Sequence, residues 1–263
     1  VRNIKFKDND VYKDEELFEV VDTTTGSILN IYKINNDVEK IKRLYTEKNY
    51  HNCMIKYEIK SLENDQADIV FTIDEGKKVK IESISFDGNQ HFDDDDIKDV
   101  MQTQEKGFWS ILTSSGDLKE TELDNDVIRI ESLYKNNGFI DVKVSDAQVS
   151  LTEKSITISF QIEEGKQFKI GTIDITGDIL TTKEALIGAM VSTRSDLYNR
   201  ELIRKDLLAL TDLYSNQGYA NVNVAPLIDK DEKTNTVNIS FKIAKGELVY
   251  FNRIIITGNS KTR

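Results

Sequence analysis

The chain has 263 residues, of which 38% are hydrophobic and 31% are charged, and its formal net charge is −11. Such a composition is typical of a folded protein with a heavily charged surface. The acidic balance argues against a nucleic-acid partner, because an acidic surface repels phosphates. The single cysteine, Cys53, excludes an intrachain disulfide.

No stretch of the sequence reaches the ~18 consecutive apolar residues that a membrane-spanning helix needs. The first residues, Val1 to Ile4, already resemble the start of a strand rather than a secretory signal. The sequence stops at Gly258-Asn259-Ser260, directly after another strand pattern. We therefore expect the chain to be a piece of a longer protein.

Three kinds of anchor recur along the chain and divide it into repeats. They are an apolar strand start, a Leu-Tyr pair, and a glycine that follows Glu or Lys. The spacings between successive copies are 80, 89 and 81 residues for the strand starts, 89 and 80 for the Leu-Tyr pairs, and 89 and 81 for the glycines. The anchors are, in that order, Phe6, Phe86, Ile175 and Ile256; Leu44, Leu133 and Leu213; and Gly76, Gly165 and Gly246.

Within each copy the anchors predict the element order β-α-α-β-β. The first strand alternates apolar and polar residues. A short helix follows, at 14–21, 93–101 and 181–190, with Asp14, Asp93 and Thr181 as expected N-caps and a capping box between Thr181 and Glu184. A longer amphipathic helix then ends at Asn49, Gly138 or Gly218, residue types that accept the left-handed conformation. We expect the next aromatic residue to fold back onto that helix.

Two strands forming a hairpin complete each copy. The first of the pair is the more polar, and in the third copy it contains Pro226, which belongs on a sheet edge because proline lacks a ladder donor. The predicted fold class is α+β, with tandem modules that each place two helices on one face of a three-stranded mixed sheet. The expected domains are 1–79, 80–168 and 169–248, and 249–263 would begin a truncated next module. Apolar pairs in the linkers, such as Val79 and Ile81, indicate joints that are partly ordered.

This arrangement resembles the POTRA (polypeptide-transport-associated) domain. The resemblance rests on an opening strand that ends in Gly88-Asn89, a long helix that ends in Leu213-Tyr214 with Gly218-Tyr219, and a last strand that ends in Glu164-Gly165. The middle copy alone carries nine extra residues, within Gln104–Asp117, similar to the aromatic insert of the third POTRA domain of outer-membrane β-barrel assembly proteins. The resemblance implies that the copies are the second to fourth POTRA domains of such a protein.

The resemblance also implies a function and partners for this chain. The chain would be a periplasmic receptor arm, tethered to the outer membrane through a C-terminal barrel. It would bind unfolded outer-membrane β-barrel proteins and dock accessory lipoproteins. Two alternatives stay open: the POTRA arm of a related translocation or secretion transporter or import pore, and a passive structural spacer.

The residue patterns that could indicate a catalytic or metal site have simpler structural interpretations. His51 and Cys53 could suggest a thiol or metal site, but a buried structural cysteine is the ordinary interpretation. The run Asp93–Asp96 lacks the spaced carboxylates of a calcium loop and suits a first helical turn. No phosphate-binding glycine motif is present. We therefore expect no enzyme activity, no cofactor and no metal. The recurring Asp37, Asp126 and Asp206 are interpreted as polar residues on the outer face of the long helix.

The edge strand of the middle copy is the predicted client-binding site. Edge strands offer unpaired main-chain groups to another extended chain, and such pairing tolerates many sequences. A polar run interrupts the alternation of this strand, as a β-bulge would. Phe108 and Trp109 of the insert are expected to add a side-chain pocket. The predicted strand residues are Val142, Lys143, Val144, Ser145, Asp146, Ala147, Gln148 and Val149.

Overall fold

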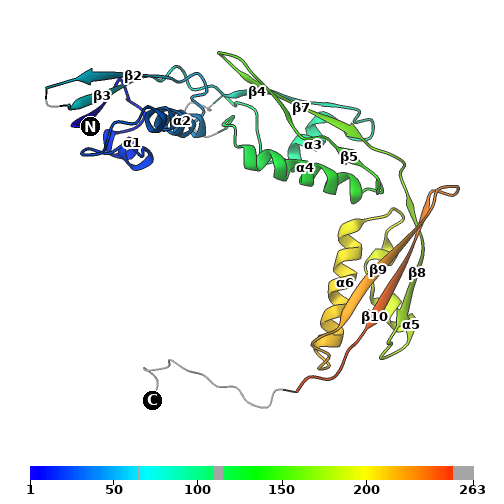
Figure 1. Cartoon of the computed structure of the whole chain (residues 1–263). Coiled ribbons are helices and arrows are strands. Elements are labelled where there is room, and N and C mark those ends of the chain that lie inside the picture. The colour runs from blue at the N-terminus through cyan, green and yellow to red at the C-terminus, as the bar shows by residue number, and fades with distance from the viewer. Residues whose placement is uncertain (64, 109–114, 251–263) are drawn as a thin grey trace. The chain divides into compact units, whose positions relative to one another are not determined.

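The computed structural model describes residues 1–63, 65–108 and 115–250 (Figure 1). The chain divides into two compact units. The first unit comprises Val1–Asp87, His91–Ile128 and Ser145–Gln161. The second comprises Gly88–Gln90, Arg129–Val144 and the chain from Ile162 onward.

The helices and strands follow the predicted order β-α-α-β-β three times. The first copy contains β1 (Asn3–Lys7), α1 (Asp14–Val20), α2 (Ile31–Glu47), β2 (Met54–Ser61) and β3 (Ala67–Asp74). The second contains β4 (Ile81–Asp87), α3 (Asp94–Val100), α4 (Glu120–Lys135), β5 (Lys143–Val144), β6 (Gln148–Leu151) and β7 (Ile156–Glu163). The third contains β8 (Lys169–Gly177), α5 (Lys183–Ala189), the 3-10 turn Ser192–Arg194, α6 (Arg200–Ser215), β9 (Asn223–Asp231) and β10 (Thr236–Ala244).

Each copy forms a mixed sheet in which the last strand lies in the centre. The orders are β1-β3-β2, β4-β7-β5 with β6 also on β7, and β8-β10-β9. The first strand of each copy pairs with the central strand in parallel, and the hairpin partner pairs antiparallel. The prediction that the more polar hairpin strand lies at an edge is confirmed. Pro226 lies in the edge strand β9, opposite Phe241.

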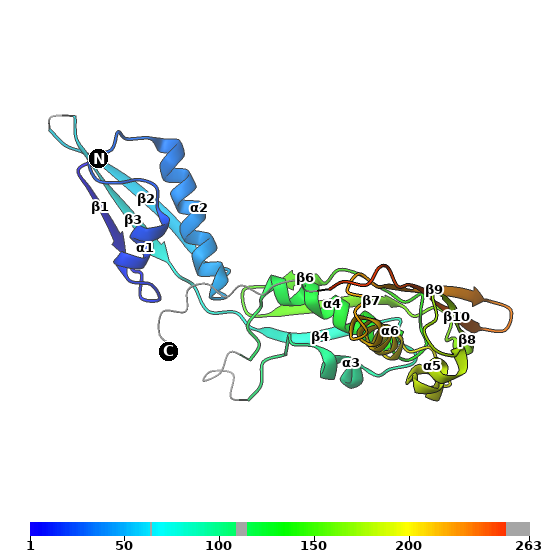
Figure 2. The ribbon, with the colours of Figure 1, turned by 90° about the horizontal axis from the view of Figure 1, so that it is seen from below.

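Two helices share one face of the sheet in the first and third copies. Leu17 of α1 and Ile34, Ile41 and Tyr45 of α2 join a single apolar core with alternate residues of β3. The third copy repeats this with Leu186, Ile203, Leu210 and Tyr214. Figure 2 shows α2 running along the sheet formed by β1, β3 and β2. The α+β class and the one-faced arrangement are therefore confirmed.

The long helices end as the sequence predicts. Asn49, Gly138 and Gly218 have φ angles of 69°, 95° and 96°. The amide of the next aromatic residue then donates back to the tyrosine carbonyl in the last turn of each helix, as Tyr50 does to Tyr45. Those two rings lie 6.2 Å apart edge to face. The returning aromatic residue therefore fixes the direction in which the hairpin leaves the helix.

Two of the expected helix caps are wrong by one residue. Asp14 is the first residue of α1, and Lys13 is its N-cap, with the Lys13 amide donating to Glu16. In the third copy Thr182, not Thr181, caps α5 and accepts from the Ala185 amide. Asp93 is the N-cap of α3, as expected. The remaining acids of that run lie in the first turn of α3, where the helix dipole favours them.

The interpretation of the recurring aspartates as outer-face residues is wrong. Asp37, Asp126 and Asp206 are 0%, 0% and 2% exposed. The Asp37 carboxylate accepts from the amides of Asp22 and Thr23 and from the Thr23 hydroxyl. The other two carboxylates accept from backbone amides alone, those of Gln102 and Thr103 for Asp126 and those of Val191 and Ser192 for Asp206. Each carboxylate thus holds the chain that leaves the short helix against the long helix.

A tyrosine in the last turn of each long helix adds a second recurring tie. The Tyr45 hydroxyl donates to Glu75, which also accepts from the Val11 amide. Burial and the Glu75 carboxylate raise the pKa of Tyr45. Lys245 replaces the glutamate in the third copy, and there the Tyr214 hydroxyl donates to the Asp178 carbonyl. A backbone acceptor thus takes the place of the missing carboxylate.

The linkers are ordered, as their apolar pairs predict. Val79 and Phe168 are each 1% exposed. Their amides donate to the carbonyls of Asn49 and Gly138 at 2.9 Å, and Val249 does the same to Gly218. The expected strand around Ile256 lies outside the described residues. Among the helices of the described residues, none combines the length and the apolarity that crossing a membrane requires.

Replacing Asp37 with alanine tests the buried carboxylate. The Asp37→Ala substitution leaves two backbone amides and a hydroxyl without their acceptor, and we expect it to lower the free energy of unfolding by about 3 kcal/mol. Glu39→Ala changes an exposed carboxylate of the same helix and should change it by less than ~0.5 kcal/mol. Urea unfolding followed by circular dichroism measures both. Equal effects of the two variants would contradict the role assigned to Asp37.

Candidate interaction site

The strand predicted to bind clients is divided into two pieces by a β-bulge. Val144 pairs with Ile162 on one side of the break, and Gln148 pairs with Ser159 on the other. Four residue steps on this strand therefore face three on β7. Ser145 bridges the break, because its amide donates to the Gln161 carbonyl and its hydroxyl accepts from the Gln161 amide. The interruption seen in the sequence is thus a bulge held by a serine side chain.

The residues of this strand differ in their access to solvent. Val142 is 4% exposed and belongs to the core. Val144, Ser145 and Ala147 are half-buried, whereas Lys143, Asp146, Gln148 and Val149 are exposed. The accessible part is therefore the bulge and β6.

The side chains of β6 give this edge an apolar character. Val149 lies opposite Ile158, and Leu151 lies opposite Ile156. Because Ile158 and Ile156 are buried, Val149 and Leu151 point to the same face as the core. They nevertheless stay 43% and 45% exposed. An extended chain placed beside β6 would find both main-chain groups and two open apolar side chains.

The other edge of the same sheet is partly covered by the insert. The amide of Ile81 in β4 donates to the Gly116 carbonyl, and its carbonyl accepts from the Lys106 amide, both at 2.8 Å. The Ile84 amide donates to the Glu105 carboxylate. These contacts occupy main-chain groups at the start of β4. The β6 edge is therefore the more open of the two edges.

Phe108 of the insert is not brought to the predicted strand. Phe108 is 91% exposed, and Trp109 lies outside the described residues. Both described ends of the insert, Lys106 and Gly116, bond to β4, on the opposite side of β7 from β6. A pocket shared by Phe108 and β6 therefore has no support in this arrangement.

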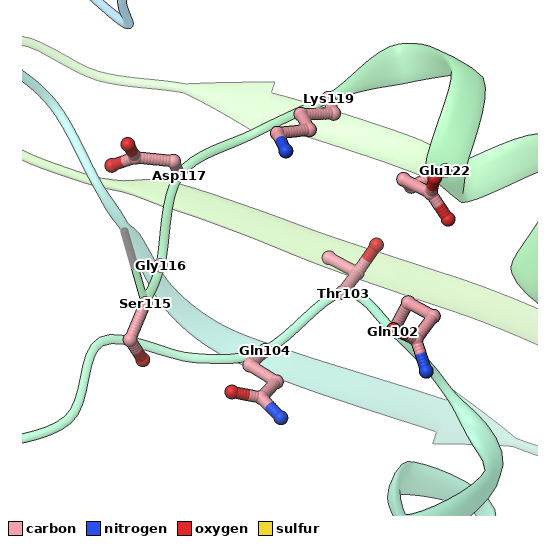
Figure 3. Close-up of a pocket in the computed structure, with 8 residues that line it drawn as sticks. All are labelled: Gln102, Thr103, Gln104, Ser115, Gly116, Asp117, Lys119 and Glu122. Carbon is pink, nitrogen blue, oxygen red and sulfur yellow. The ribbon is translucent and has the colours of Figure 1, made fainter. Parts of the chain in front are cut away.

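A polar hollow of about 520 Å³ lies between the ends of the insert and the start of α4. Figure 3 shows the eight residues around it, with the Thr103 hydroxyl among them. Thr103 is 6% exposed, and its hydroxyl has no hydrogen-bond partner in the part of the chain that the structure describes. In the first copy the equivalent Thr23 hydroxyl donates to Asp37. Asp117, Lys119 and Glu122 bring charges of both signs to the rim, so the hollow favours no particular ligand charge.

His51 and Cys53 do not form a reactive pair. Cys53 is 2% exposed, and burial together with Glu75 raises the pKa of its thiol to about 11. Burial lowers the pKa of His51. Within the described residues, no cluster of histidine, cysteine or carboxylate side chains is suited to hold a metal ion. The ordinary interpretation of Cys53 as a buried structural residue agrees with these features.

Sequence reasoning missed the amide contacts that join successive long helices. The Asn49 side chain accepts from the Leu118 amide at 2.8 Å, just before α4. In the second unit the Asn136 side chain accepts from the Glu201 amide in the first turn of α6. The available signal was an asparagine near the end of the first two long helices. Asn49 was interpreted only as a helix-ending residue, and Asn136 was not singled out.

Comparison with known proteins decides the family. The POTRA family, described as "Surface antigen variable number repeat", matches residues 1–76, 79–165 and 168–246. The chain belongs to the POTRA family. The resemblance seen in the sequence is thus confirmed.

Several relatives match this POTRA chain along its whole length. It is 26% identical to the outer membrane protein assembly factor BamA of Nitratidesulfovibrio vulgaris, which it covers to 34%. It is 30% identical to BamA of Neisseria meningitidis serogroup B, covering 33% of that protein. A putative outer membrane protein assembly factor of Treponema pallidum is 27% identical. The chain therefore spans about a third of the length of these curated relatives.

Solved structures of POTRA domains also match. The crystal structure of Haemophilus influenzae BamA POTRA3-5 is 15% identical, with a TM-score of 0.46 over 92% of this chain and 95% of that one. The N-terminal domain of Omp85 from Thermosynechococcus elongatus is 14% identical, with a TM-score of 0.38 over 92% of this chain and 94% of that one.

The state of Cys53 gives a direct test of its burial. A thiol with a pKa of about 11 instead of 9 holds ~100-fold less thiolate at neutral pH, and burial restricts access further. We expect iodoacetamide at pH 8 to alkylate the native POTRA chain at least ~100-fold more slowly than the urea-unfolded chain. Mass spectrometry of timed samples measures both rates. Comparable rates in the two states would show that Cys53 is an accessible, reactive thiol.

Proposed function

We propose that the chain forms part of the periplasmic arm of an outer-membrane protein assembly factor, as the second to fourth POTRA domains. The support is the run of three POTRA repeats together with matches, over the whole of this chain, to about a third of proteins named BamA. The aromatic insert in the middle copy supports this register. The proposed module boundaries are those of the sequence analysis, near residues 79–80 and 168–169.

The proposed role is that of a scaffold rather than a catalyst. Its clients would be unfolded outer-membrane β-barrel proteins, and its other partners would be accessory lipoproteins of the assembly complex and the C-terminal barrel of its own protein. The single observation that carries the client-binding role is the open β6 edge, with its bulge and with Val149 and Leu151 exposed at 43% and 45%.

Strand addition is the proposed binding mode. A client segment in extended form would pair with the outward main-chain groups of β6 and of the bulge, and side chains on its core-facing side would cover Val149 and Leu151. Main-chain pairing tolerates many client sequences. The bulge limits the ladder to a short segment, which also protects the free edge against unwanted pairing between copies.

Weak affinity follows from this mode. An unfolded client must be ordered on binding, and that entropy cost offsets much of the gain from a short ladder. Weak, reversible binding suits a periplasmic arm that must release its clients. Phe108 and its neighbour Trp109 stay a separate predicted contact, and for Phe108 this contact is not beside β6.

Photo-crosslinking tests the β6 edge. A crosslinking side chain at Val149 or Leu151 should capture an unfolded barrel substrate several-fold more than one at Asp124, an exposed position on α4. Comparison of the variants by gel under identical irradiation gives the yields. Yields at the two β6 positions no higher than at Asp124 would dispose of strand addition at this edge.

A proline variant separates main-chain pairing from simple proximity. With the crosslinking side chain at Leu151, Val149→Pro and Ser150→Pro each remove one amide of β6, and only one of these neighbouring amides points away from β7, because outward amides alternate along an edge strand. We expect the two prolines to lower the crosslink yield unequally. Circular dichroism confirms that both variants stay folded. An unchanged yield in both would mean that the main chain of β6 does not pair with the client.

A further inference from the structure

A second hollow of about 520 Å³ lies in the first unit, where the first and second POTRA copies meet. Its lining comes from α2, from the loop between α2 and β2, from the linker after β3 and from the turn between β6 and β7. The Asn52 side chain donates to the Glu153 carbonyl and connects that loop with the turn. The hollow is thus built from four segments far apart in the sequence.

The charge of this hollow is opposite to that of the chain as a whole. Lys42, Lys77 and Lys154 line it, against the single carboxylate of Glu153. The chain carries 46 acidic and 35 basic residues, so its lysines have many possible partners. Even so, none of these three ammonium groups forms an ion pair with any described residue. Three lysines without an ion-pair partner among the described residues therefore line one hollow.

The wall of the hollow contains an unsatisfied polar atom. His51 lines it, and the Nε2 atom of His51 is buried without a hydrogen-bond partner among the described residues. A buried ring nitrogen without a partner costs free energy, which a ligand atom within reach would recover. In the tautomer protonated at Nε2, this atom donates a hydrogen bond, and the half-buried ring would have to turn for a ligand in the hollow to accept it. Three lysines and a histidine thus line the hollow, and an oxyanion suits both kinds of side chain.

The neighbouring strand indicates a peptide as the source of that oxyanion. Met54 lines the hollow, is 57% exposed and is also the first residue of β2. Because β2 is an edge strand, its unpaired main-chain groups run directly out of the hollow. A chain antiparallel to β2 would end at Met54, and an acidic side chain in such a segment could reach the same place. A free phosphate would gain nothing from this edge.

We propose that this hollow binds a carboxylate group of a peptide chain, either a chain end or an acidic side chain, while the peptide lies along β2. Long-range repulsion by the acidic surface is screened beyond about 8 Å at physiological salt, so the local lysines decide the interaction. The site shares no residue with the β6 edge. Either proposal can therefore fail alone.

Three short peptides of alternating valine and threonine test the inference on the whole chain. One carries a central aspartate and an amidated end, one has a free C-terminal carboxylate and no acidic residue, and one is neutral and amidated. We expect at least one of the two carboxylate peptides to bind about 10-fold more tightly than the neutral peptide in fluorescence anisotropy, since three exposed ion pairs each contribute modestly. The His51 ring signals should shift in the NMR spectrum with the tighter peptides.

Matched triple variants locate the effect. Lys42→Gln, Lys77→Gln and Lys154→Gln together should remove this preference. Lys7→Gln, Lys166→Gln and Lys242→Gln change three exposed lysines elsewhere by the same total charge and should keep it. Three outcomes would overturn the proposal: equal binding of the neutral peptide, equal loss in both triple variants, or a His51 shift with inorganic phosphate as strong as with the carboxylate peptides.

Discussion

A buried aspartate in the middle of each long helix holds together the two-helix layer of these POTRA modules. Asp37, Asp126 and Asp206 accept amides from the chain that leaves the short helix, and each lies almost without exposure in its core. In the first and third copies this tie keeps both helices on one face of the sheet, with the hairpin strand at a free edge. In the second copy the hairpin strand also lies at an edge of its sheet, and β6, the part of that edge that we assign to client binding, pairs only with β7 among the described strands.

The second constraint is the left-handed residue that ends each long helix. Its backbone sends the returning aromatic residue onto the helix, and its carbonyl accepts the amide of Val79, Phe168 or Val249. The same few atoms thus end a helix, start a hairpin and position the linker. The side chains of Asn49 and Asn136 then bond near the start of the next long helix. The residues that end a long helix consequently also make contacts between successive copies.

Much of the fold could be predicted from the sequence. Element order, helix ends and the edge position of β9 depend on local patterns, such as apolar periodicity, Gly138 and Pro226. The aspartates were misinterpreted although their spacing held the answer: Asp37 lies three residues after Ile34 and four before Ile41, on the apolar stripe. The contacts of the insert with Ile81 and the convergence of three lysines on one hollow depend on long-range packing, which periodicity does not encode. The bulge at Ser145 was partly predictable. The polar run that interrupts the strand was visible in the sequence, but the hydrogen bonds of Ser145 were not.

Amide hydrogen exchange tests whether the β6 edge binds clients. With an unfolded barrel substrate present, we expect slower exchange for those amides of Gln148–Leu151 that point away from β7, and no change along the exposed face of α4. Exchange that stays unchanged on β6, or that slows equally over the helices, would contradict the assignment of this edge to clients.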